Sequence, residues 1–103
     1  MNKLVWVGAL GAFFVSATAA QTACAVPDGG RLLASGCFQC HGTNGQNGTF
    51  NAIAGGGQLD MLNKLRDMRS KDPRGSIMNP HARGYTSEQL ACITLYFSKQ
   101  RKL

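Results

Sequence analysis

The chain has 103 residues, of which 44% are hydrophobic and 16% charged, and its formal net charge is +6. This length suits one small domain and excludes a multidomain protein. The chain carries no nucleic-acid-binding motif, which argues against a nucleic-acid partner despite the positive charge.

Residues 1–20 have the pattern of a secretory signal peptide. Lys3 precedes an apolar run over 4–15, and small residues follow over 16–20. The apolar run is shorter than the roughly 20 residues of a membrane-spanning helix. We therefore expect residues 1–20 to be removed during export across the bacterial inner membrane.

The mature domain is then 21–103, with 83 residues, and its expected location is the periplasm, without stable membrane insertion. An alternative is lipoprotein processing at Cys24, which residues 21–23 do not favour because they lack the usual apolar residue. A domain of this size buries only about 60–65% of its unfolded surface, so it needs an additional stabilising group.

The most informative stretch is Cys37-Phe38-Gln39-Cys40-His41. Two thiols three positions apart lie on one helical turn and can add to the two vinyl groups of a haem, and the histidine that follows can bind the iron. The pattern therefore predicts one covalent haem on Cys37 and Cys40, with His41 as an axial ligand. Without this haem we expect the chain to be poorly folded.

A cysteine pair has three alternative roles to haem attachment. A zinc site needs two more ligands at close spacing, whereas Cys24, Cys92 and His81 are isolated in the sequence. A thioredoxin-like redox pair needs a preceding strand, which the glycine-rich stretch 28–36 does not predict. A structural disulfide between the two motif cysteines is the third alternative.

The first half of the mature chain predicts a helix followed by a loop. Asp28 can cap a short helix that runs into 37–41. Glycine and asparagine dominate 42–57, which indicates a loop around one haem edge, with Phe50 and Ile53 facing the haem. The first half of this loop could equally be a mobile surface segment.

The second half predicts two longer helices. Residues 58–70 carry apolar side chains at helical spacing. These are Met61, Leu62, Leu65 and Met68. A turn at 71–75 and an irregular segment at 76–85 follow, and Thr86-Ser87-Glu88-Gln89 is a capping box that begins the last helix. The expected fold is all-α, with about three main helices and an aromatic face of the last helix packed on the first.

The second axial position on the iron could be filled by Met78 or His81, or left open. Met78 is the best candidate, because the irregular segment can present its thioether to the iron. His81 is the rival ligand, and a site left open is the third alternative. Met61 and Met68 share one face of a helix, which is more typical of core packing.

The distal ligand decides the function. A thioether raises the reduction potential, and two strong protein ligands leave no position for a substrate, so His41 and Met78 together predict one-electron transfer without catalysis of a substrate reaction. A displaceable distal ligand would instead indicate a haem sensor or a small peroxidase.

Cys24 and Cys92 have two interpretations. In an oxidising compartment two remaining thiols tend to form a disulfide, provided that their helices touch. Otherwise they are independent small residues, with Cys92 buried as a minor hydrophobic side chain. The sequence leaves both alternatives open.

The chain resembles the class I c-type cytochromes over essentially its whole mature length. The segment 37–42 matches their attachment motif, and Ile77-Met78, the stretch 82–90 and Tyr96-Phe97 are similar to their methionine loop and final helix. These later segments are most similar to the cytochrome subunit of flavocytochrome c sulfide dehydrogenases and to related periplasmic cytochrome domains.

The resemblance implies a class I cytochrome c fold with haem c on Cys37 and Cys40, His41 as proximal ligand and Met78 as distal ligand. It also implies that the first and last helices cross, which supports contact between Cys24 and Cys92. The family commonly has a proline near the position of Ile53, whose carbonyl orients the proximal imidazole. Here the stretch 50–53 has no proline, so we expect another carbonyl to make this hydrogen bond.

The expected role is that of a periplasmic electron carrier, or of the haem subunit of an oxidoreductase such as a sulfide dehydrogenase. Its partners are then redox proteins, including a flavoprotein subunit. Removal of Lys3 leaves ten basic and five acidic side chains, and this +5 charge can steer an acidic redox partner. Arg69, Lys71 and Arg83 are candidates to neutralise haem propionates.

Overall fold

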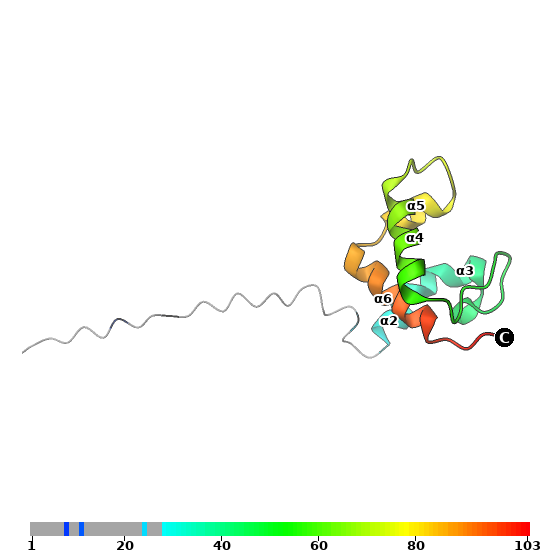
Figure 1. Ribbon diagram of the computed structural model, residues 1–103, viewed down its shortest axis with the longest axis horizontal. Coiled ribbons are helices and arrows are strands. Elements are labelled where there is room, and N and C mark those ends of the chain that lie inside the picture. Colours follow the sequence, from blue (N-terminus) through cyan, green and yellow to red (C-terminus); the bar gives the residue numbers. More distant parts are fainter. Residues whose placement is uncertain (1–7, 9–10, 12–23, 25–27) are drawn as a thin grey trace, which may run out of the picture.

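The structure is a computed structural model that describes Gly8, Gly11, Cys24 and residues 28–103, and every regular element among these residues is a helix (Figure 1). The expected signal peptide, 1–20, lies outside the described residues apart from its two glycines. The elements are α2 (Gly29–Ala34), η1 (Ser35–Cys37), α3 (Phe38–His41), η2 (Thr43–Gly45), α4 (Gln58–Ser70), α5 (Met78–Arg83) and α6 (Ser87–Ser98). The all-α prediction is confirmed, with three main helical segments: the run from α2 to α3, α4, and α6.

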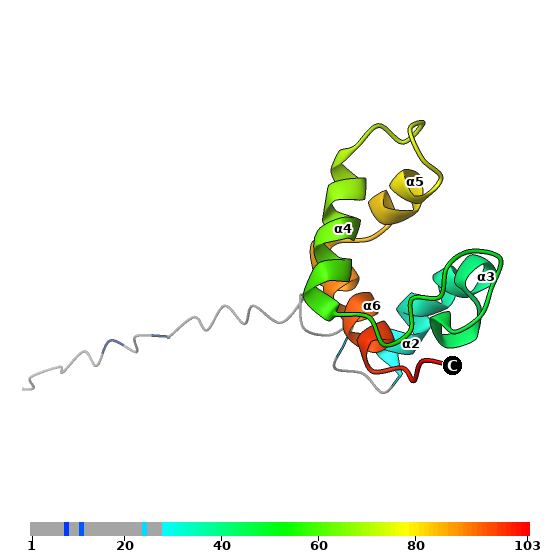
Figure 2. The ribbon, with the colours of Figure 1, turned by 45° about the vertical axis from the view of Figure 1, so that its right-hand side comes forward.

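The three main segments meet at α6. α2 packs on α6, and α4 packs on both α5 and α6. Figure 2 shows the result: α4 and α5 form one arm, α2 and α3 form the other, and α6 lies where the arms join. In the part of the chain that the structure describes, no helix has both the length and the apolar character needed to cross a bilayer.

The first helical run carries the cysteine motif. α2, η1 and α3 follow one another without a gap, so the predicted first helix is confirmed. Asp28 precedes this run with a φ of 59°, and its side chain makes no capping hydrogen bond. The expected side-chain cap is therefore wrong, because a capping residue needs an extended backbone rather than a left-handed one. Asp28 instead accepts a hydrogen bond from the Leu32 amide through its carbonyl, at 2.8 Å.

α6 begins with the expected capping box. The Thr86 hydroxyl accepts from the Gln89 amide at 3.1 Å, and the Gln89 side-chain carbonyl accepts from the Thr86 amide at 2.9 Å. This pair satisfies two amides of the first turn, which fixes where the helix starts. One face of α6 then supplies most of the buried core, namely Leu90, Ile93, Thr94 and Phe97.

The first run packs closely on α6, as the sequence predicts. A Cβ on Gly30 would lie 3.4 Å from the Tyr96 Cβ and 3.6 Å from the Cys92 carbonyl oxygen, which is ordinary van der Waals contact, so the two helices touch at this point. One turn before the motif histidine, the Phe38 ring lies 6.4 Å from the Tyr96 ring and 6.2 Å from the Phe97 ring, centroid to centroid. These contacts hold the motif against the last helix.

Cys24 and Cys92 are joined by a disulfide, with their Cα atoms 5.5 Å apart. This separation lies within the range that a disulfide spans. Cys92 is buried in α6, whereas Cys24 is exposed. Of the two alternatives that the sequence leaves open, the structure adopts the bridge, which ties the segment before α2 to the last helix.

The segment 76–85 was expected to be irregular, but part of it is helical. It contains the short helix α5, which begins at Met78 and includes Pro80 as its third residue. A proline in the first turn removes only an amide that has no partner within the helix, so Pro80 does not prevent helix formation here. Ser76 starts the turn, since its carbonyl accepts from the Asn79 amide at 3.1 Å and its hydroxyl from the Met78 amide at 3.3 Å.

Candidate functional site

A central cleft lies between the two arms of the molecule. It consists of three cavities of about 300, 160 and 40 Å³, and His41 and Met78 line all three of them. Cys37 lines two of the cavities and Cys40 lines two. The structure therefore brings all four residues of the predicted haem site to one cleft.

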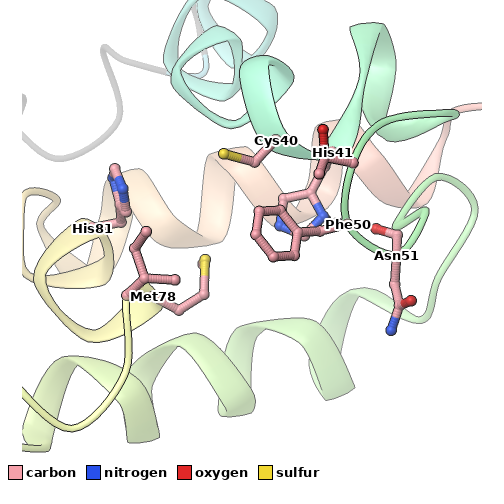
Figure 3. A pocket seen from close by; sticks show the side chains of 8 residues that line it. Cys40, His41, Phe50, Asn51, Met78 and His81 are labelled. Carbon is pink, nitrogen blue, oxygen red and sulfur yellow. Dashed lines mark hydrogen bonds between the residues drawn. The ribbon is translucent and has the colours of Figure 1, made fainter.

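The cysteine motif and Met78 approach this cleft from opposite arms. Cys40 and His41 belong to α3 in the first helical run, whereas Met78 begins α5. Figure 3 shows the Cys40 thiol and the Met78 thioether both pointing into the space beside the His41 ring. One arm thus offers two thiols and an imidazole, and the other offers a thioether.

The two motif cysteines are free, so the alternative of a disulfide between them is not adopted. Burial raises the pKa of the Cys37 thiol above its usual value, because removal of the sulfur from water disfavours the thiolate, and the nearby Cys40 adds to this effect. A raised pKa lowers the fraction of thiolate, the form that attacks other sulfurs. Among the described residues, no group of three or more His, Cys, Asp or Glu side chains gathers as a metal site.

His41 is oriented by a backbone carbonyl. Its Nδ1 donates a hydrogen bond to the carbonyl oxygen of Asn51 at 2.7 Å (Figure 3). A carbonyl can only accept, so Nδ1 carries the ring proton and the lone pair of Nε2 is left for a metal. The expected hydrogen bond is confirmed, and Asn51 is the residue that supplies it.

The loop that carries Asn51 is fastened to the motif helix. The Phe50 amide donates to the Cys40 carbonyl at 2.9 Å, and the Ile53 amide donates to the Gly45 carbonyl at 2.8 Å. Gly45 has a φ of 72°, and a Cβ there would lie 2.7 Å from Ile53 Cγ1. This position therefore requires glycine both for its backbone conformation and for space.

The distal candidates lie on one short helix. Met78 and His81 are three residues apart on α5, and both line the largest cavity of the cleft. Met78 is half-buried, whereas His81 is exposed. Figure 3 shows the thioether directed toward the motif and His81 on the flank of the same cavity.

Apolar side chains form the wall of the cleft between these ligands. They are Ile53, Met61, Leu65, Met68, Ile93 and Phe97. Met61 packs against the buried core, as expected, and both Met61 and Met68 are half-buried and also line the cleft. Phe50, expected to face the haem, is half-exposed at the mouth of the largest cavity. A wall of this composition suits a flat apolar macrocycle, so the residues present fit a haem.

The expected propionate partners are placed differently. Arg69 and Arg83 line a pocket that shares no residue with the central cleft, and Lys71 is paired with Asp67 at 2.7 Å. Lys64 lines the cleft instead. The sequence does not predict the position of Lys64, because helical spacing alone does not say which face of α4 borders the cleft.

Asn79 is a second residue that the sequence analysis missed. Its side chain is almost fully buried, with 3% exposed, and its amide nitrogen donates to the Asp72 carbonyl at 2.8 Å. This bond fastens the turn before α5 to the residue that follows Met78. Asn79 therefore positions the thioether at the cleft.

We expect Asn79→Ala to lower the free energy of unfolding by about 1 kcal/mol, because the fold loses the hydrogen bond of the buried Asn79 side chain, while the Asp72 carbonyl keeps its bond from the Gly75 amide. Denaturant unfolding followed by circular dichroism measures the effect. Asn63→Ala, at an exposed position of the neighbouring α4, is the matched control and should change stability by less than about 0.5 kcal/mol. Equal losses in the two variants would contradict the positioning role.

Comparison with curated proteins finds a relative of stated function. The chain is 31% identical over 74 residues to the cytochrome subunit of sulfide dehydrogenase from Chlorobaculum tepidum, and the match covers 71% of this chain and 67% of the relative. No protein-family profile matches the chain. No solved structure matches it either.

The match agrees with the all-helical fold and with the resemblance found in the sequence. A cytochrome implies a haem, and the central cleft has the ligands and the apolar wall to hold one. The chain therefore belongs to the c-type cytochromes, haem proteins that transfer electrons.

Proposed function

We propose that this protein is a periplasmic monohaem cytochrome that transfers one electron at a time, with haem c attached to Cys37 and Cys40. His41 and Met78 are the axial iron ligands in this proposal. The observation that carries it is that His41 and Met78, from opposite arms, line the same three cavities together with the two free cysteines. When bound, the haem supplies an iron that changes between ferric and ferrous states.

His41 is prepared for metal binding by its hydrogen bond. The Asn51 carbonyl, 2.7 Å from Nδ1, keeps the proton on that nitrogen and keeps the ring from rotating. The same bond makes Nε2 a better electron donor, because the proton on Nδ1 is partly shared with the carbonyl.

Met78 supplies a soft ligand that favours the ferrous state and therefore raises the reduction potential. The side chain is half-buried, and the Asn79 amide fastens the start of its helix to Asp72. Because both axial positions are then taken by protein atoms, a substrate has no free position on the iron. This supports electron transfer over a reaction with a bound substrate.

The apolar wall excludes water from the iron. Ile93 and Phe97 are almost fully buried, with 1% and 2% exposed, and Met61, Leu65 and Met68 cover the side of α4. An environment without water rearranges little when the charge of the iron changes, so the reorganisation energy of electron transfer stays small. At the mouth of the cleft, Phe50 and Ile77 are exposed, so a partner can approach one haem edge there.

The relative is named as a subunit of sulfide dehydrogenase. We extend this to a subunit role here, with a flavoprotein as the partner that the family resemblance implies, and with a free electron carrier as the alternative. In either role the signal peptide 1–20 directs the chain to the periplasm.

The first test is the intact mass of the unreduced protein after production in an export-competent host. We expect residues 1–20 to be absent, the haem mass to stay with the denatured chain, and two hydrogens to be missing because of the Cys24–Cys92 bridge. Cys37→Ala and Cys40→Ala should reduce covalent haem, whereas a Cys24→Ser/Cys92→Ser control should keep it. A colourless product with the mass of the bare polypeptide would refute the haem proposal.

Met78→Ala should keep the covalent haem but lose the thioether-to-iron charge-transfer band, and its reduction potential should fall. The absorption spectrum of the oxidised protein shows the band, and a redox titration followed by absorbance measures the potential, with Met68→Leu as a control that leaves the band in place. Retention of the band in Met78→Ala would transfer the assignment to Met61 or Met68.

Carbon monoxide added to the reduced wild-type protein extends this test of the distal ligand. We expect no prompt binding at neutral pH. Prompt and complete binding would instead favour a haem sensor or a small peroxidase with a displaceable distal ligand, and His81→Ala then shows whether His81 is that ligand.

The subunit role predicts that the protein elutes from native periplasm with a flavin-containing partner, in a complex larger than a single 83-residue domain. Size-exclusion chromatography with flavin fluorescence and haem absorbance measures this. Elution as a lone haem protein would support the free carrier and contradict the subunit role.

A further inference from the structure

A second pocket lies on the α4–α5 arm, apart from the central cleft. Arg66, Arg69 and Ser70 of α4 and Arg83 of α5 line it, and its volume is about 350 Å³. We call these three arginines and the serine the arginine pocket. None of them lines any of the cavities of the central cleft, so haem binding does not explain their convergence.

In contrast to their basic neighbours, the three arginines form no ion pair among the described residues, although the charge of Arg83 contributes to lowering the pKa of Asp72. Three nearby bases each pair with an aspartate: Lys64 with Asp60 at 2.8 Å, Lys71 with Asp67 at 2.7 Å, and Arg74 with Asp72 at 3.1 Å. The aspartates of this arm are therefore already in use. Three like charges around one pocket repel one another, and a bound anion would relieve that repulsion.

One guanidinium of the pocket is held in place by the fold. Arg66 Nε donates to the Ser87 hydroxyl at 3.1 Å, which leaves the terminal nitrogens of Arg66 free. Arg69 lies three residues further along α4, on the same side of the helix, and Arg83 ends the neighbouring α5. A guanidinium presents parallel N–H groups that match two oxygens of one anion.

We propose that the arginine pocket binds a small divalent oxyanion of the tetrahedral class to which sulfate and phosphate belong. Three cations around one pocket match a divalent ion better than a single carboxylate. The residues that line the pocket are three arginines and one serine, without the aromatic or aliphatic side chains that form the centre of most protein–protein interfaces. This composition favours a small ion over a protein partner.

The test uses the haem-loaded full-length mature protein, labelled with ¹⁵N, titrated with sodium sulfate and separately with sodium phosphate at constant ionic strength. We expect saturable shifts confined to residues of the arginine pocket, including the Arg66, Arg69 and Arg83 side chains. Arg69→Gln and Arg83→Gln should each weaken binding by about 10-fold or more, the loss expected for a charged hydrogen bond. Arg101→Gln, at an exposed position outside the pocket, should bind as the wild type does.

The outcomes separate this proposal from the haem proposal, because the haem spectrum is recorded in the same samples and should not change. Shifts that grow linearly with salt, or equal weakening in Arg101→Gln, would show general screening and overturn the site. Binding of an oligoglutamate peptide to the same residues without binding of sulfate or phosphate would overturn it in favour of an acidic protein partner.

Discussion

The close packing of the first helical run on α6 is the constraint on which the central cleft depends. The helices touch where Gly30 lies against Tyr96, and the Phe38 ring lies against Tyr96 and Phe97. Because η1 and α3 continue the run without a gap, the direction of the Cys37–His41 turn follows from this crossing. A larger side chain at Gly30 would move the motif as well as the helix.

The opposite wall depends on the same helix. α4 packs on both α6 and α5, so Met78 reaches the cleft through a chain of contacts that also begins at α6. Ile93 and Phe97 belong both to the buried core and to the lining of the cleft. The distance between the two candidate axial ligands, His41 and Met78, is therefore set by α6. One helix is enough to position both ligands, although they come from different arms and the core is small.

The parts of this arrangement that depend on local sequence could be predicted. The cysteine motif, the capping box of Thr86 and the apolar spacing of α4 each involve residues a few positions apart, and the structure agrees with them. The errors have nonlocal or conformational causes. The segment 76–85, expected to be irregular, contains α5, which accommodates Pro80 in its first turn. The Asp28 side chain does not cap because its backbone is left-handed. The choice of Asn51 as the carbonyl beside His41 depends on how the glycine-rich loop folds back, which spacing alone does not determine.

The net charge does not show where the charges lie on the surface, and their positions affect how a partner approaches. The total of +6 suggests attraction of an acidic partner to the whole surface, but the aspartates of α4 and the following turn pair with bases close to them in sequence. The unpaired arginines of α4 and α5 line the arginine pocket, which is separate from the cleft. The mouth of the cleft is instead lined by Thr49, Phe50, Asn51 and Ile77, which carry no charge, and Phe50 and Ile77 are 50% and 63% exposed. In the proposed role, an electron-transfer partner that docks at this mouth would meet an uncharged surface, so its affinity there would depend on contact area, while charge elsewhere on the surface would affect mainly the rate of approach.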